Sequence, residues 1–168
     1  MQLLSLSKLE LGAEQTFYEE IDLHEMCRDA VQKTAVLCES KNLSVDCADT
    51  HITVRTDSGL LEQVLMNYLS NAIRYNRPGG SAEVSLRKRG KYAVLTVRDT
   101  GIGIRREDLG QIFSRFYRAD RSRSSEGTGL GLSMAAWIAR VHGGSIRAES
   151  VYGEGSVFTA ELPSEEQA

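Results

Sequence analysis

The chain has 168 residues, the length of a single domain. Hydrophobic residues make up 41% and charged residues 26% of it, which is typical of a globular domain and argues against disorder. The net charge of −3 gives no electrostatic footprint for nucleic acid, and no apolar run approaches the ~20 residues that span a bilayer. Three cysteines without CxxC spacing argue against a disulfide framework or a zinc site.

The first part of the chain predicts two helices and two short strands. Leucines recur at helical spacing within residues 1–11, which is the pattern of a helix end. A second helix is expected after Asp22, because Asp22 and Glu25 have the spacing of a capping box and residues 23–37 carry one apolar face. Weak alternation over residues 43–56 predicts two short strands.

The remainder of the chain predicts hairpins and two further helices. In chain order we expect a helix at about 58–75, strands at about 82–88 and 91–98, a glycine-rich loop over 99–131, a helix at about 132–142, and strands at about 145–150 and 156–162. Hairpins without repeated βαβ units favour the α+β class. The predicted architecture is a two-layer α/β sandwich, with helices on one face of a mixed, mostly antiparallel sheet.

The helix expected over residues 58–75 carries a polar edge beside its apolar face. At about 100° per residue, four polar or aromatic residues fall in one band: Asn67, Asn71, Arg74 and Tyr75. Asparagine carbonyl oxygens suit a hard cation such as Mg²⁺, which keeps its waters and takes few protein ligands. The alternative is a solvated flank of an ordinary amphipathic helix.

Two glycine-rich segments have the composition of ligand-binding loops. Asp99 to Gly103 directly follows a predicted strand, and a carboxylate there can accept a hydrogen bond from an exocyclic amine such as that of adenine. Residues 127–131 directly precede a helix, where backbone N–H groups made accessible by glycine bind phosphate. A simple turn and a flexible linker are the respective alternatives. The glycines at 153 and 155 predict only a hairpin turn.

A long arginine-rich segment, residues 105–126, separates these two loops. It holds six arginines and four acidic residues. Loops of this length in a compact domain are usually functional, so we predict a lid that supplies arginines beside the phosphate loop. Phe113, Phe116 and Tyr117 are expected to anchor its middle.

Taken in order, these segments resemble the ATP-binding catalytic domain of sensor histidine kinases, in the wider GHKL family that includes Hsp90, gyrase B and MutL. Asn67 to Tyr75 is similar to the N box, Asp99 to Gly103 to the G1 box, Ile112 to Arg118 to the F box, and Gly127 to Gly131 to the G2 box. The F box is specific to histidine kinases within the wider family. The resemblance therefore implies a Bergerat ATP-binding fold and protein-histidine kinase activity with ATP and Mg²⁺.

The resemblance also implies roles for the matching residues in nucleotide binding. Asn71 would hold Mg²⁺ with support from Asn67, Asp99 would accept from the adenine amine, and Tyr75 would pack against the base. The two glycine boxes would complete the site through Gly101, Gly103, Gly127, Thr128, Gly129, Leu130 and Gly131.

Three residues are expected to act nearer the reaction itself. Arg118, together with Arg74, would reach the phosphates. Asn67 stands where ATP hydrolases of the wider family carry a glutamate that activates water. Because an amide lacks that basicity, we expect wasteful hydrolysis of ATP to be slow.

The same resemblance implies how the chain is divided: the end of a dimerisation helix (1–12), the ATP-binding catalytic domain (13–163) and a tail (164–168). The phosphoacceptor histidine is expected on the dimerisation domain, because none of the three histidines of this chain lies in a phosphoacceptor box. The partners implied are that domain and the receiver domain of a response regulator, with no nucleic acid. The isolated domain is expected to be monomeric and cytoplasmic, and the full-length protein a membrane-anchored homodimer.

Two other functions stay open at this point. One is an ATP hydrolase of the wider family, against which Asn67 and the F box argue. The other is a degenerate module that only docks a partner, against which the intact N, G1 and G2 boxes argue.

Overall fold

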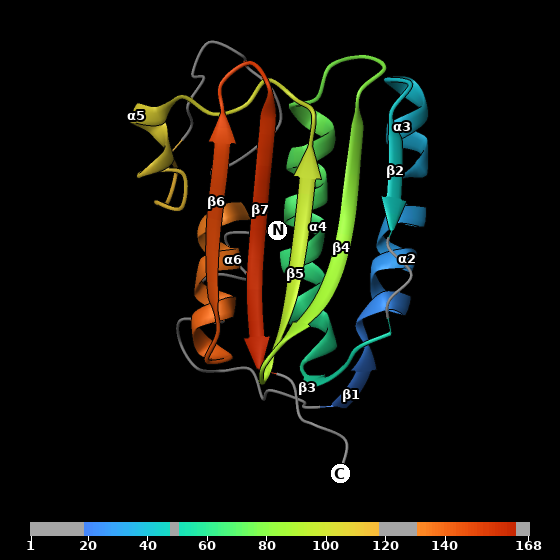
Figure 1. Cartoon of the computed structure of the whole chain (residues 1–168), viewed down its shortest axis with the longest axis vertical. Coiled ribbons are helices and arrows are strands. Elements are labelled where there is room, and N and C mark those ends of the chain that lie inside the picture. Colours follow the sequence, from blue (N-terminus) through green and yellow to red (C-terminus); the bar gives the residue numbers. More distant parts are fainter. Residues whose placement is uncertain (1–18, 48–50, 118–130, 164–168) are drawn as a thin grey trace.

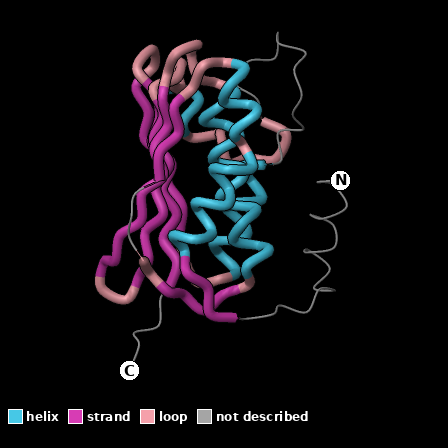
Figure 2. The backbone as a smooth tube through the Cα atoms, turned by 90° about the vertical axis from the view of Figure 1, so that its right-hand side faces the viewer, coloured by secondary structure: helices cyan, strands magenta, loops and turns pink. Residues whose placement is uncertain are grey.

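A computed structural model of the chain describes residues 19–47, 51–117 and 131–163, and in it helices cover one face of a five-stranded sheet (Figures 1 and 2). The strand order is β2 (Ser44–Cys47), β4 (Ser81–Arg89), β5 (Tyr92–Asp99), β7 (Gly155–Pro163) and β6 (Ser145–Val151). Only the β2–β4 pair is parallel, and the other three pairs are antiparallel. The predicted two-layer sandwich with a mixed, mostly antiparallel sheet is confirmed.

The helical layer consists of α2 (Leu23–Lys33), α4 (Ser58–Arg74) and α6 (Gly131–Val141), with α4 in the middle (Figure 1). Asp57 caps α4 by accepting a hydrogen bond from the Leu60 N–H at 3.2 Å. The apolar face predicted from the 3.6-residue period is the buried face: Leu60, Leu61, Val64, Leu65, Tyr68, Leu69, Ala72 and Ile73. These side chains form the centre of the core, where the Tyr68 ring lies 5.3 Å from that of Phe158 on β7.

The helix predicted over residues 23–37 is divided in two, and this part of the prediction is wrong. α2 ends at Lys33, and a short helix, α3 (Ala35–Ser40), follows. Thr34, which is buried, stands at the break. Its hydroxyl donates to the carbonyl oxygen of Val31 at 2.8 Å. Threonine side chains can bond to nearby backbone groups in this way and so compete with the regular hydrogen bonds of a helix.

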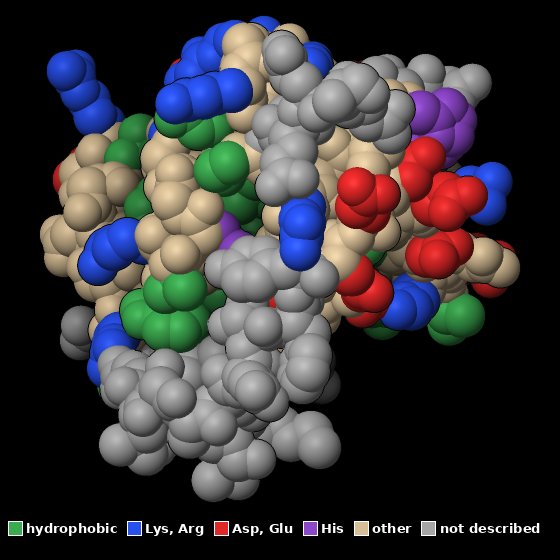
Figure 3. All heavy atoms as spheres, turned by 90° about the horizontal axis from the view of Figure 1, so that it is seen from below, with side chains coloured by type: hydrophobic (Ala, Val, Ile, Leu, Met, Phe, Trp, Pro, Cys, Tyr) green, Lys and Arg blue, Asp and Glu red, His purple; other side chains and the backbone are tan. Residues whose placement is uncertain are grey.

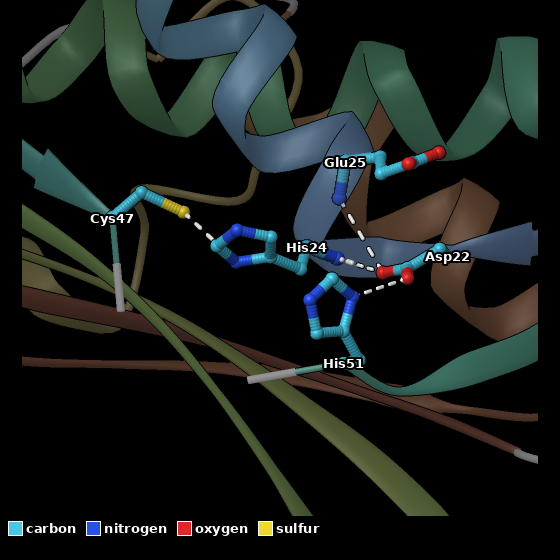
Figure 4. A network of polar contacts seen from close by, with 5 residues as sticks. All are labelled: Asp22, His24, Glu25, Cys47 and His51. Carbon is cyan, nitrogen blue, oxygen red and sulfur yellow. Dashed lines mark hydrogen bonds and ion pairs between the residues drawn. The ribbon is translucent and has the colours of Figure 1, made fainter. Parts of the chain in front are cut away.

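A two-stranded sheet, which the sequence did not predict as such, lies beside the start of α2. In it β1 (Glu19–Asp22) pairs antiparallel with β3 (Thr53–Thr56). Asp22 ends β1 and also caps α2, accepting from the backbone N–H groups of His24 at 2.8 Å and Glu25 at 3.4 Å (Figure 4). The predicted helix start is therefore confirmed.

Two histidines lie at this same end of the fold and make local contacts. His51 Nδ1 lies 2.5 Å from the carboxylate oxygen Oδ2 of Asp22, and the centroid of the His51 ring lies 4.8 Å from that of His24 (Figure 4). His24 Nδ1 in turn lies 3.9 Å from Cys47 Sγ. Seen from below, the molecule carries a group of acidic side chains near a histidine, with basic side chains among them (Figure 3).

The predicted segments at the two ends of the chain, the helix end over 1–11 and the tail over 164–168, lie outside the described residues. Among the helices that the structure describes, none is long and apolar enough to cross a membrane.

Candidate nucleotide-binding site

Asp99, the last residue of the central strand β5, places a carboxylate at the end of the sheet with only 9% of the residue exposed. Its Oδ1 accepts a hydrogen bond from the Gly101 N–H at 2.8 Å, and the Ser156 N–H also donates to it. Burial raises the pKa of Asp99, and the two N–H donors offset part of that rise. No cationic side chain of the described ranges forms an ion pair with Asp99, so the carboxylate keeps acceptor capacity for a ligand.

The glycines after Asp99 let this loop pack directly on two neighbouring segments. A Cβ at Gly101 would lie 2.4 Å from the carbonyl oxygen of Tyr75, at the end of α4. Gly103 has a φ of +71°, and a Cβ there would lie 2.3 Å from the carbonyl oxygen of Val151 at the end of β6. The glycine spacing of the G1 box therefore has a packing reason, independent of any ligand.

The polar edge predicted on α4 extends from the start of α6 to the loop that follows Asp99. Asn67 Nδ2 donates to the carbonyl oxygen of Gly131, the first residue of α6, at 3.0 Å. Asn71, one turn further along, is half-buried, and its side-chain amide has no hydrogen-bond partner in the described parts of the chain. Arg74 and Tyr75 are exposed. The structure thus brings Asn67 to the end of the G2 box and Tyr75 to the G1 box.

The segment predicted to be a lid, residues 105–126, is described only over residues 105–117. A one-turn helix, α5 (Arg106–Leu109), begins it, and Ile112 is buried while Phe113 packs against the core. Phe116 does not anchor the segment as predicted. It is 61% exposed and has a φ of +61°, so its ring is not buried in the core. Arg118 and residues 127–130 lie outside the described residues.

Sequence reasoning treated residues 76–80 as a turn and missed their polar contacts. Asn76 is buried: its Nδ2 donates to the Ser81 carbonyl oxygen at 2.9 Å, and its Oδ1 accepts from the Arg77 N–H at 2.9 Å. Lys41 was also missed. Its ammonium donates to the carbonyl oxygens of Ile73 at 3.0 Å and Arg74 at 2.7 Å, so it caps the C-terminus of α4. Asn76 could have been found, because it directly follows the N box in the sequence. Nothing in the sequence around Lys41 indicated its contact with the end of α4.

No group of three or more His, Cys, Asp or Glu side chains in the described ranges could hold a metal ion. Mg²⁺ needs no such group, because it takes one or two protein oxygens and completes its shell with water and substrate phosphates. The amide oxygen of Asn71, with no competing partner in the same ranges, fits that requirement.

The sequence of this chain is similar to the sequences of known histidine kinases. Residues 56–166 match the model of the family described as histidine kinase-, DNA gyrase B- and HSP90-like ATPases. Over 165 residues, 96% of the chain, it is 38% identical to the sensor-like histidine kinase SenX3 of Mycolicibacterium smegmatis and 36% identical to the sensor histidine kinase RppB of a Synechocystis species. The chain spans 43% and 36% of the lengths of these two curated relatives.

Solved structures give the same result at the level of the fold. The mycobacterial sensor histidine kinase MprB has a TM-score of 0.77 at 26% identity, covering 89% of this chain and 100% of that one. Histidine kinase ThkA, in complex with the response regulator protein TrrA, has a TM-score of 0.78 at 25% identity, covering 98% of this chain and 47% of that one.

Proposed function

The chain belongs to the family of histidine kinase-, DNA gyrase B- and HSP90-like ATPases, and it is a histidine kinase ATPase domain homologous to sensor histidine kinases. On this basis we propose that it binds ATP with Mg²⁺ and transfers the γ-phosphoryl group to a histidine on a dimerisation domain. A receiver-domain aspartate of a response regulator would then accept the group. The full-length parent would be a membrane-anchored homodimer, with this domain on the cytoplasmic side.

The observation that carries this proposal is the carboxylate of Asp99. It is buried at the end of β5, receives two backbone N–H groups, and has no cationic partner in the described ranges. A carboxylate in this state accepts a charge-assisted hydrogen bond from an amine. The exocyclic amine of adenine is such a donor, whereas guanine presents a carbonyl oxygen at the same position.

The residues around Asp99 supply the rest of the proposed nucleotide site. Tyr75, exposed beside the loop, would cover the base, and Arg74 and Arg118 would reach the phosphates. The backbone N–H groups of residues 127–131 would bind the phosphate oxygens as the chain enters α6. Asn71 would give its amide oxygen to Mg²⁺, with Asn67 in support. Bound there, the metal supplies neutralisation of the charge on the phosphates.

Transfer itself asks mainly for positioning and charge neutralisation, because the transition state of phosphoryl transfer is loose. The bond between the γ-phosphorus and the bridging oxygen breaks, a phosphorus–nitrogen bond forms, and ADP leaves. A neutral imidazole attacks through its unprotonated nitrogen, so the site needs no strong base.

Asn67 supports histidine as the acceptor rather than water. Its Nδ2 donates to the Gly131 carbonyl oxygen, a contact that a glutamate carboxylate has no proton to make. The amide therefore joins α4 to α6 and leaves no general base at this position to activate water.

Calorimetry with a non-hydrolysable ATP analogue tests the proposal. We expect binding that strengthens when Mg²⁺ is added, and GTP that binds far more weakly. Labelled ATP should also leave no stable phosphohistidine on this chain alone. It should label an added dimerisation domain only slowly, because two separate domains lack the high effective concentration that a tether between them gives. Equal binding of ATP and GTP, or rapid ATP turnover by the chain alone, would contradict the proposal.

A further inference from the structure

Three segments that are distant in sequence meet at the guanidinium of Arg77. They are the turn after α4, the loop after β5 and the turn between β6 and β7, all at the upper end of Figure 1. Arg77 Nη2 donates to the carbonyl oxygen of Gly101 at 3.3 Å and, at shorter range, to that of Gly153. One side chain therefore links the loop that follows Asp99 to the hairpin beside it.

Backbone hydrogen bonds complete the same junction. The Ile102 N–H donates to the Tyr75 carbonyl oxygen at 3.0 Å, and the Gly153 N–H donates to the Ile102 carbonyl oxygen at 2.7 Å. The peptide unit between Gly101 and Ile102 is thus held at its carbonyl by Arg77 and at its N–H by Tyr75. This leaves it little freedom to rotate.

That peptide unit is coupled to the carboxylate of the site. The N–H on the other side of Gly101 donates to Asp99 Oδ1 at 2.8 Å, so the orientation of Gly101 fixes one oxygen of the carboxylate. We propose that Arg77 is a positioning residue for nucleotide binding, which holds Gly101 and through it directs the Asp99 carboxylate at the amine of the base. This inference rests on the proposed function of Asp99.

The chemistry of the side chain fits this role. A guanidinium nitrogen carries two N–H donors held in one plane, and Arg77 Nη2 directs its donors at carbonyl oxygens from two different segments. Arg77 is exposed, and hydrogen bonds at exposed positions add little to the stability of the whole fold. We therefore expect its loss to alter the loop rather than to unfold the protein.

The test compares two ligands in calorimetry: a non-hydrolysable ATP analogue, and the matching purine nucleotide that lacks the 6-amino group. The ratio of their affinities measures how well Asp99 recognises the amine. A residue that only supports the fold would change both affinities together, whereas a residue that directs Asp99 changes the ratio.

Three variants are measured beside the unchanged chain. Arg77→Ala should weaken binding of the ATP analogue about tenfold and reduce the affinity ratio by a similar factor, the scale of one well-placed charge-assisted hydrogen bond. Arg77→Lys should restore part of both. Arg89→Ala is the matched control, because Arg89 is also an exposed arginine whose guanidinium donates to a residue of another element, 2.5 Å from Glu161 Oε1, at the far end of β4. It should change neither value.

The outcomes separate this inference from the proposed function. If the unchanged chain does not distinguish the two nucleotides, the role of Asp99 fails and the inference fails with it. If the unchanged chain does distinguish them and Arg77→Ala keeps the same ratio, or loses both affinities equally, only the role of Arg77 is overturned. Should Arg77→Ala not fold, Arg77→Lys decides through the same ratio.

Discussion

Replacing Gly101 by alanine would place a methyl group where the structure has no room for one. The new Cβ would lie 2.4 Å from the Tyr75 carbonyl oxygen, 2.8 Å from Asp99 Oδ1 and 3.0 Å from the Tyr75 carbonyl carbon. Two of these atoms are backbone, which cannot rotate away as the end of a side chain can. The φ of Gly101 lies outside the left-handed region, so the effect comes from contact alone.

The size of the effect follows from two contributions. Overpacking of this kind costs about 1–3 kcal/mol. Moving the Tyr75 carbonyl also weakens its hydrogen bond from the Ile102 N–H, now 3.0 Å long, which contributes roughly 1 kcal/mol. The expected loss is therefore about 2–4 kcal/mol, or a fall in Tm of roughly 5–15 °C for a chain of this length.

Thermal unfolding measured beside Gly110→Ala tests this reasoning. Gly110 follows α5 with a φ of −70°, and a Cβ there would have no described atom within 4 Å beyond its chain neighbours. The control should therefore unfold at the temperature of the unchanged chain, while Gly101→Ala unfolds well below it and binds the ATP analogue more weakly. If the two variants unfold at the same temperature, the close approach between the G1 loop and the end of α4 is wrong.

Three further predictions concern single side chains. Asp99→Asn should weaken ATP roughly tenfold to a hundredfold in calorimetry. Burial raises the pKa of Asp99 in the folded state, so ionisation of this carboxyl lowers the stability of the unchanged chain as pH rises above about 4. Asparagine does not ionise, so in melting experiments without ligand the stability of the variant relative to the unchanged chain should increase with pH. A difference that does not change with pH would contradict this. Asn71→Ala should remove the gain in nucleotide affinity on adding Mg²⁺ without lowering Tm, and a preserved gain would exclude its metal role. Tyr68→Phe should leave Tm unchanged or raise it, because the buried Tyr68 hydroxyl has no hydrogen-bond partner among the residues that the structure describes. A loss of stability above about 1 kcal/mol would show that the hydroxyl has a partner.

The sequence predicted those parts of the fold that one element specifies by itself. α4 was predictable because eight apolar residues recur at helical spacing, and the strands of the hairpins because turn residues bound them. The position of Asp99 followed from the end of β5. The polar edge of α4 followed from the same helical period that gave its core face.

What could not be predicted depends on contacts between distant segments. β1 has the sequence EEID, with no alternation, and is a strand only because β3 lies beside it. The break at Thr34 depends on a hydroxyl that bonds to the backbone instead of pointing to solvent. Arg77 lies within an ordinary turn sequence, and its two acceptors come from segments 24 and 76 residues further along the chain.

The capping of α4 by Lys41 has an electrostatic consequence for the whole site. The C-terminus of a helix carries about half a negative charge, which favours a cation and opposes an anion. Asn71 lies in this last turn, while α6 presents its N-terminal, positive pole at Gly131. The two helices would thus produce a field that draws a metal ion to one side and phosphate oxygens to the other. By placing an ammonium group on the carbonyl oxygens of Ile73 and Arg74, Lys41 reduces the repulsion that a polyphosphate would otherwise meet from α4.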